Sequence, residues 1–127
     1  MDAGATLLTI ENDPERAAQA AELLRTDERA RVLTTDWADA LEDGPFDLIF
    51  ADVGTAKTPA ALNSLVGALR PGGSLVLDNF SPPMYLPDGL HGGDAERDAL
   101  FAHPRLMCSE LQVTRKERVI LATRRPA

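Results

Sequence analysis

Residues 69–80 read LRPGGSLVLDNF, and they combine the end of a helical pattern, a Pro-Gly-Gly turn and an apolar strand. The apolar residues up to the start of this stretch follow the spacing of one helix face: Leu62, Leu65, Val66 and Leu69. The Pro-Gly-Gly turn favours the end of a helix, and SLVLDNF then continues as a strand. A helix that leads straight into an apolar strand is typical of an α/β domain.

Outward from this stretch, strands and helices alternate along the chain. Short apolar runs predict strands at 6–10, 31–36 and 46–52. The last of these, FDLIFAD, is apolar enough to be buried on both faces, as parallel strands are. Helices are expected in three places: 14–25 after an Asp13 cap, from Thr58 and Pro59 to the Pro-Gly-Gly turn, and 95–102 after an Asp94 cap.

The C-terminal segment 105–125, RLMCSELQVTRKERVILATRR, predicts two strands joined near Arg115 and Lys116. So short a connection implies an antiparallel pair. The predicted order is therefore βαβ(α)βαβαββ. We expect a single α/β domain over residues 1–127, with a mostly parallel sheet and a C-terminal antiparallel hairpin.

Composition limits the classes of partner. A chain of 127 residues with 44% hydrophobic residues fits one domain with a core. Its net charge of −7 disfavours nucleic acid and anionic membrane surfaces. The single cysteine, Cys108, cannot form an internal disulfide, and no apolar run approaches the ~20 residues that span a bilayer. We therefore expect a soluble, cytoplasmic protein.

Acidic side chains follow the predicted strands in series. Glu11 follows the first strand, and Asp36 ends the second with Trp37 beside it. Ligands of open α/β sheets bind beyond the carboxyl ends of the strands, where Glu11 could accept hydrogen bonds from two ribose hydroxyls. Asp36 could accept one from the adenine amine, with Trp37 as a flat apolar wall. The alternative is that each acid only forms a turn or caps a helix.

A second group of polar residues suits a cation. Asp52 ends the 46–52 strand, and Asp78 and Asn79 lie at the end of SLVLDNF. Neighbouring parallel strands lie roughly 4.8 Å apart, so these side chains could converge. Two carboxylates and an amide oxygen are ligands that Mg²⁺ accepts. The alternative is that Asp52 caps the turn DVGT and that Asp78 and Asn79 open a turn before Ser81.

Five segments resemble, in order, the class I S-adenosylmethionine-dependent methyltransferases: LLTIENDPERAAQAAELL, VLTTDWADAL, FDLIFADVGTAK, LRPGGSLVLDNF and HPRLMCSELQVTRKERVILATRR. The similarity is to small-molecule O-methyltransferases related to catechol and caffeoyl-coenzyme A O-methyltransferases, and it covers about residues 6–124. LRPGGSLVLDN is its strongest piece. The resemblance implies a Rossmann-like methyltransferase sheet, S-adenosylmethionine as cofactor and a small-molecule methyl acceptor.

The resemblance also implies roles for individual residues. The cofactor would be bound by five of them: Glu11, Asn12, Asp36, Trp37 and Asp52. Asp52, Asp78 and Asn79 would hold Mg²⁺ or another divalent cation, which would lower the pKa of the acceptor hydroxyl. A lysine shortly after the first metal acid is the base in better-known relatives. Lys57 lies five positions beyond Asp52, further than in those relatives, so Lys57 joins Asp52 as a catalytic candidate with a solvated lysine as the alternative.

The largest departure from the family lies before Glu11. The family's first strand, its Gly-rich turn and the following helix are absent, and no G-x-G motif occurs. In the family that strand lies between the two that match 6–10 and 46–52, so we expect an N-terminally truncated sheet. Three explanations stay open: a fragment or misplaced start, a natural truncation that repacks or borrows a strand from a dimer partner, and a degenerate relative that no longer binds the cofactor.

The complete protein is expected to transfer a methyl group from S-adenosylmethionine to an oxygen of a small molecule, with this chain weak or inactive alone. One alternative is a non-catalytic module for binding or homodimer formation, because an incomplete sheet offers an edge to another chain. The other is a fragment of a nicotinamide-dependent oxidoreductase, because Glu11 suits that ribose equally well. Segment 81–93, SPPMYLPDGLHGG, is expected to form a lid or substrate loop.

Overall fold

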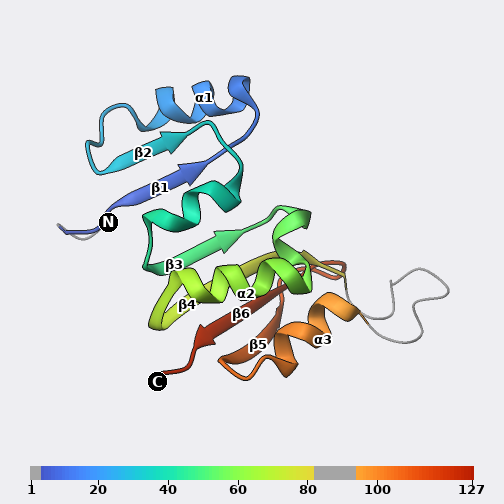
Figure 1. Cartoon of the computed structure of the whole chain (residues 1–127). Helices are drawn as coiled ribbons and strands as arrows, with labels where there is room; N and C mark the ends of the chain where they lie inside the picture. Colours follow the sequence, from blue (N-terminus) through green and yellow to red (C-terminus); the bar gives the residue numbers. More distant parts are fainter. Residues whose placement is uncertain (1–3, 82–93) are drawn as a thin grey trace. The chain divides into compact units, whose positions relative to one another are not determined.

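The computed structural model describes residues 4–81 and 94–127 (Figure 1). The chain divides into two compact units, residues 1–43 and 44–127. The predicted lid segment 81–93 lies outside the described residues except for Ser81. In the part of the chain that is described, no helix combines the length and the apolar character needed to cross a membrane. The prediction of one methyltransferase-like domain over residues 1–127 stays a prediction.

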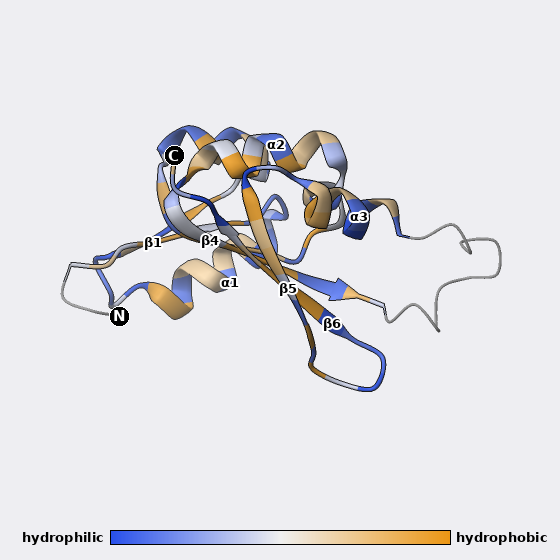
Figure 2. Cartoon of the chain, turned by 90° about the horizontal axis from the view of Figure 1, so that it is seen from below, coloured by the Kyte–Doolittle hydropathy of each residue, from blue (hydrophilic) through white to orange (hydrophobic). Residues whose placement is uncertain are grey.

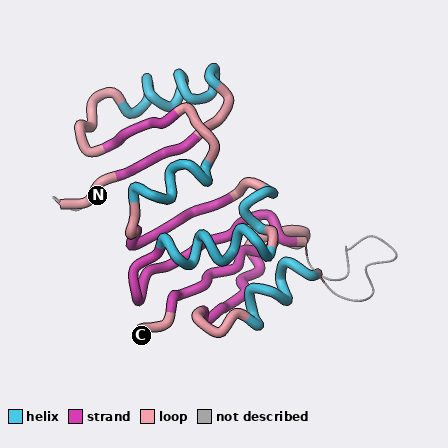
Figure 3. Tube along the Cα trace, viewed as in Figure 1, coloured by secondary structure: helices cyan, strands magenta, loops and turns pink. Residues whose placement is uncertain are grey.

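The first unit is a strand-helix-strand crossover followed by a short helix. Its elements are β1 (Leu7–Ile10), α1 (Pro14–Leu24), β2 (Ala30–Leu33) and the 3-10 helix η1 (Trp37–Asp43). β1 and β2 pair in parallel along their whole length, with α1 as the connection (Figure 3). Asp13 caps α1, because its carboxylate accepts hydrogen bonds from the N–H groups of Glu15 and Arg16. The strands and the helix predicted in this region are confirmed.

The second unit is a four-stranded mixed sheet with two α-helices. Its elements are β3 (Phe46–Ala51), the 3-10 helix η2 (Gly54–Lys57), α2 (Pro59–Ala68), β4 (Leu69–Phe80), α3 (Ala95–Ala102), β5 (Leu106–Gln112) and β6 (Arg118–Arg124). The strand order is β3-β4-β6-β5. β3 runs parallel to β4, whereas β6 is antiparallel to both β4 and β5. The predicted α/β fold with a C-terminal antiparallel hairpin is confirmed.

One face of this sheet carries the core of the second unit. Alternate residues of β4 and β6 are fully buried on that face: Leu75, Leu77, Ile120 and Ala122. The helices α2 and α3 lie on the same side of the sheet (Figure 2). They bury the apolar stripe that the sequence predicts for α2, together with one residue of α3: Leu62, Leu65, Val66 and Leu100.

The prediction that the 46–52 strand is buried on both faces is wrong. Leu48 and Phe50 of β3 are each 61% exposed, whereas Ala51 is buried. Side chains alternate between the two faces of a strand, and α2 and α3 cover only one face of this sheet. Leu48 and Phe50 project from the other face, so an apolar run alone does not show that both faces are covered.

The Pro-Gly-Gly turn lies inside β4 rather than at the end of α2. The helix ends at Ala68, and Leu69 already pairs with β3. Gly72 has a φ of 81°, in the left-handed region that glycine adopts readily. Gly73 is tightly packed, because a Cβ atom there would lie 2.9 Å from the carbonyl oxygen of Arg70. The backbone geometry therefore requires both glycines of the motif.

Candidate functional site

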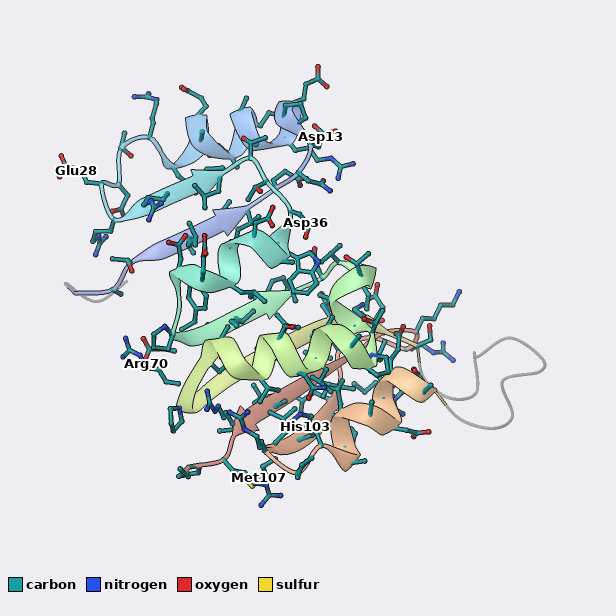
Figure 4. The ribbon with its side chains drawn as sticks, viewed as in Figure 1. Asp13, Glu28, Asp36, Arg70, His103 and Met107 are labelled. Atoms are coloured by element: carbon teal, nitrogen blue, oxygen red, sulfur yellow. The ribbon has the colours of Figure 1, made fainter. Side chains whose placement is uncertain are left out.

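The acids predicted at the strand ends of the first unit follow two neighbouring parallel strands. Glu11 comes directly after β1, and its N–H continues the ladder by donating to the carbonyl of Leu33 at 3.1 Å. Asp36 follows β2 and is exposed (Figure 4). Both acids therefore lie beyond the carboxyl ends of strands, the place at which open α/β sheets bind ligands.

Each of these carboxylates also supports the local backbone. Oε1 of Glu11 accepts a hydrogen bond from the N–H of Asp13 at 2.9 Å, and so holds the turn before α1. Oδ1 of Asp36 accepts one from the N–H of Ala38 at 2.9 Å, at the start of η1. These are the turn and capping roles that the sequence left as the alternative. A carboxylate has two oxygens with several acceptor sites, so ligand binding is compatible with both roles.

The two remaining cofactor candidates of this unit differ in exposure. Asn12 is exposed between Glu11 and the cap residue Asp13. Trp37 is half-buried and is the first residue of η1, directly after Asp36. Their proposed contacts with the cofactor stay predictions.

Asp52 and Asp78 lie at the carboxyl ends of neighbouring parallel strands in the second unit. Ala51 of β3 pairs with Leu77 of β4, and each acid is the next residue along its strand. Strands paired in this way lie roughly 4.8 Å apart. Asp52 is exposed and Asp78 is half-buried. The strand adjacency on which the predicted cation site depends is therefore present.

The backbone turns at Asn79, near the end of the paired strands β3 and β4. Its φ of 64° lies in the left-handed region, which asparagine tolerates better than most residues. Oδ1 of Asp78 accepts a hydrogen bond from the N–H of Asn79 at 2.7 Å. The local turn that the sequence left as the alternative is therefore formed. The side chain of Asn79 is exposed beside it.

Lys57 is buried against the end of β4. Only 9% of the residue is exposed. Its Nζ donates to the carbonyl oxygen of Asn79 at 3.5 Å and lies 5.1 Å from the centre of the Phe80 ring. The alternative of a solvated lysine is therefore wrong, because η2 directs this residue inward. A positive charge lies next to the strand end that carries Asp78 and Asn79.

The sequence did not reveal a charged cluster around Phe80. Arg97 of α3 donates from Nη1 to Asp94 and from Nε to Glu110, each at 3.0 Å, and from Nη2 to the carbonyl of Ser81 at 2.8 Å. Its guanidinium also lies 5.4 Å from the centre of the Phe80 ring. Phe80 therefore contacts two cations, and the ring and the ion pairs together fix the end of β4.

A signal for this cluster was only partly present in the sequence. Asp94 and Arg97 are three residues apart at the start of α3, a spacing that places them on one helix face. Glu110 comes from β5, and its pairing with Arg97 depends on how α3 packs against that strand. A tertiary contact of this kind has no local sequence pattern.

A metal ion at the ends of β3 and β4 would have few protein ligands. In residues 4–81 and 94–127, no group of three or more His, Cys, Asp and Glu side chains is placed to hold a metal ion. Asp52 and Asp78 offer two carboxylates, and Asn79 adds an amide oxygen. These are hard donors, and Mg²⁺ commonly completes its shell with water or substrate oxygens. The donor chemistry fits Mg²⁺, and the metal stays a prediction.

Solved structures give the comparison with known proteins. A candidate O-methyltransferase from Klebsiella pneumoniae matches 98% of this chain with 26% identity and a TM-score of 0.78. An O-methyltransferase from Bacillus cereus in complex with SAH matches 98% of it with 22% identity and a TM-score of 0.78. This chain has the class I methyltransferase fold. TomG, an O-methyltransferase of tomaymycin synthesis from Streptomyces achromogenes in complex with SAM, matches 98% with 20% identity and a TM-score of 0.78.

The methyltransferase fold is present here in a shortened form. The chain spans 64% of the Klebsiella protein, 65% of the Bacillus protein and 64% of TomG. No protein-family model matches the sequence, and no curated protein matches it significantly. The predicted likeness to O-methyltransferases and the truncated Rossmann-like sheet are confirmed by the structural comparison.

Proposed function

We propose that the complete protein transfers a methyl group from S-adenosylmethionine to an oxygen of a small molecule. The observation that carries the proposal is the placement of Asp52 and Asp78 at the carboxyl ends of adjacent parallel strands in a methyltransferase fold. Two solved neighbours were obtained with SAM or SAH bound. Because this chain spans less than two thirds of those proteins, we expect it to be weak or inactive alone.

For the cofactor, we assign the adenosine part to the first unit. Glu11 would accept hydrogen bonds from the ribose hydroxyls while Oε1 keeps its bond to the N–H of Asp13. Asp36 would accept one from the adenine amine, and Trp37 would lie against the ring. Asn12, exposed beside Glu11, is the further candidate for a ribose contact.

For the methyl acceptor, we assign Asp52, Asp78 and Asn79 as the ligands of Mg²⁺ or another divalent cation. Such a cation supplies a Lewis acid that lowers the pKa of an acceptor hydroxyl. The contribution of this chain is positional: the Asp78 carboxylate holds the N–H of Asn79, and Lys57 holds its carbonyl. Orientation of the acceptor then supplies much of the rate gain.

Lys57 is the residue whose role is least settled by sequence. A general base must lie within reach of the proton that it removes. Nζ of Lys57 instead donates to the Asn79 carbonyl, so we assign it first as a positioning residue. Lys57→Met should then weaken metal binding, whereas loss of a base would lower kcat and leave metal binding unchanged.

The similarity to O-methyltransferases supports a small-molecule methyl acceptor as the partner. Separately, a net charge of −7 disfavours nucleic acid and anionic membranes as partners. The lone free cysteine among the described residues, Cys108, suits a reducing compartment, and we infer a cytoplasmic location.

Binding of Mn²⁺ to the 127-residue chain, measured by paramagnetic relaxation, tests the metal assignment. Asp52→Asn and Asp78→Asn should each weaken binding about tenfold or more. Asp47→Asn is the matched control, because Asp47 is an exposed acid on β3, the strand that Asp52 follows, and it pairs with Arg70. Equal weakening by all three variants would show only nonspecific attraction, and the metal assignment would be wrong.

Saturation-transfer NMR with SAH and with NAD⁺ tests the cofactor. We expect binding of SAH by this chain to be weak or absent; weak binding should be removed by Glu11→Gln and left unchanged by Glu22→Gln, on the exposed side of α1. A response to NAD⁺ alone would favour the oxidoreductase and overturn the proposal. A response to neither ligand by an N-terminally extended chain would favour the non-catalytic module.

A further inference from the structure

The candidate metal ligands Asp78 and Asn79 lie at a β-bulge. From 77 to 80, β4 advances three residues, whereas its antiparallel partner β6 advances only two, from 120 to 118. One extra residue in one strand of a pair is what defines a bulge, and bulges often re-aim side chains beside functional sites. The parallel pairing of β4 with β3 ends just before the bulge, at Leu77. The orientation of Asp78 and Asn79 therefore depends on contacts other than regular strand pairing.

Contacts on the C-terminal side of the bulge hold the backbone there. Lys57 donates to the carbonyl of Asn79 at 3.5 Å, which is long for a hydrogen bond. The next residue, Phe80, is only 3% exposed, and the guanidinium of Arg97 lies 5.4 Å from the centre of its ring. One residue further, Nη2 of Arg97 donates to the carbonyl of Ser81 at 2.8 Å. Arg97 therefore supplies the shorter of these two bonds to the backbone.

The side chain of Arg97 is itself fixed by two carboxylates. Nη1 donates to Asp94, the cap of α3, and Nε donates to Glu110 of β5, each at 3.0 Å. The side chain of Arg97 is only 11% exposed. A guanidinium is planar with N–H groups in fixed directions, so the carboxylates that hold Nε and Nη1 also set the direction of Nη2. Arg97 thus connects α3 and β5 to the chain that leaves β4.

We propose that Arg97 is a positioning residue for the candidate metal ligands, because it holds the bulge in the arrangement in which Asp78 and Asn79 bind a divalent cation. This inference rests on the proposed function, to which the cation belongs. Mg²⁺ demands near-octahedral geometry, so the direction of each protein ligand matters when there are few of them. Lysine at position 97 would keep a positive charge between the two carboxylates, but it lacks the planar fork that reaches both Glu110 and Ser81.

Binding of Mn²⁺ to the 127-residue chain, followed by paramagnetic relaxation, tests the role of Arg97. Arg97→Lys should raise the Kd for Mn²⁺ about tenfold, as loss of an outer partner of a metal ligand does. Glu110→Asp keeps the charge but shortens the side chain that holds Nε, so it should raise the Kd as well. Arg25→Lys is the matched control and should leave the Kd unchanged, because Arg25 pairs with Glu22 on the surface and its side chain is 65% exposed.

Gly72→Ala separates positioning from stability. Gly72 lies near the start of β4, whereas Asp78 lies near its end, and its φ of 81° makes alanine costly there. This variant should lose stability in urea denaturation and keep the Kd for Mn²⁺. In the metal-free chain, the amide ¹⁵N–¹H signals of Asp78 and Asn79 should shift in Arg97→Lys and stay in place in Gly72→Ala. Circular dichroism checks folding, and if Arg97→Lys is unfolded, the Kd of Glu110→Asp decides.

Two results would overturn the positioning role and leave the proposed function intact. In the first, Asp78→Asn weakens Mn²⁺ binding, but Arg97→Lys leaves the Kd or the two amide signals unchanged. In the second, Gly72→Ala weakens binding as much as Arg97→Lys, so that lost stability alone accounts for the effect. A third result is distinct from both: if Asp78→Asn leaves Mn²⁺ binding unchanged, the metal assignment is wrong and the role of Arg97 fails with it.

Discussion

The ammonium group of Lys57 lies over the ring of Phe80, 5.1 Å from its centre. The guanidinium of Arg97 lies 5.4 Å from the same centre, and Phe80 is only 3% exposed. Phe80 directly follows Asn79, whose carbonyl accepts from Lys57. One aromatic ring therefore links two cations to the strand end that carries the candidate metal ligands.

Phe80→Leu should lower the free energy of unfolding by about 1–2 kcal/mol, since it removes two cation-π contacts and part of a buried ring. Urea denaturation measures the change. Phe101→Leu is the control, because Phe101 is 49% exposed on α3, and a change below about 0.5 kcal/mol is expected there. Equal effects of the two substitutions would show that the cation-π contacts add nothing.

Glu110→Gln should destabilise the fold by about 1–2 kcal/mol, because Arg97 keeps Asp94 but loses the second of its two counter-charges, and Arg118 loses the carboxylate beside it. The side chains of Arg97 and Glu110 are 11% and 16% exposed, and Arg118 lies 3.7 Å from the same carboxylate. Asp47→Asn removes a comparable pair with Arg70, 3.0 Å long but 77% and 55% exposed. That control should cost less than about 0.5 kcal/mol. Urea denaturation measures both changes. A smaller loss of unfolding free energy for Glu110→Gln than for Asp47→Asn would contradict the prediction.

Features that depend on chain order are predicted well by the sequence. Asp52 and Asp78 each end an apolar strand, and parallel strands joined by a helix bring their carboxyl ends to one edge. The register of Ala51 with Leu77 agrees with that expectation. The helix caps at Asp13 and Asp94 were predicted equally well, because a cap depends only on residues two or three positions away in the sequence.

Features that depend on neighbours in space are predicted poorly. Phe50 lies in an unbroken apolar run, and nothing local shows that one face of its strand stays uncovered. For Lys57 the sequence left a solvated lysine open as the alternative, because the turn of η2 that buries it has no distinctive pattern. The pairing of Arg97 with Glu110 joins residues 13 positions apart through the packing of α3 on β5.

The pKa of His103 should lie below 6.5, because burial disfavours the imidazolium and Arg105 adds repulsion. Nδ1 of His103 accepts from the N–H of Arg105 at 3.1 Å, and Nε2 lies 3.2 Å from Oδ1 of Asn63. A neutral ring protonated on Nε2 satisfies both contacts, whereas an imidazolium loses the acceptor at Nδ1. Nitrogen-15 NMR of the ring measures both the tautomer and the pKa.

This shift has a defined consequence for stability. In the unfolded chain His103 binds a proton near pH 6.5, which is above its pKa in the folded state. Its contribution to the free energy of unfolding is therefore fully present above pH 6.5. This contribution is lost as the pH falls from 6.5 through the pKa of His103 in the folded state. Arg105→Ala should raise the pKa of His103 and still leave it below 6.5, since burial is the larger cause. Arg115→Ala, at the exposed hairpin turn, should leave it unchanged, and a folded pKa above 6.5 would contradict the prediction.

Gly72→Ala should destabilise the fold by about 1–2 kcal/mol, because the left-handed backbone region is costly for a residue with a Cβ atom. The φ of Gly72 is 81°, and no atom lies within 4 Å of the position that its Cβ would take, so the cost is conformational and not steric. Gly67 provides the opposite case, since it lies in α2 with equally open space. Gly67→Ala should stabilise the fold by about 0.5–1 kcal/mol. Urea denaturation of both variants measures the difference, and a stabilising Gly72→Ala would show that the turn inside β4 does not need a positive φ.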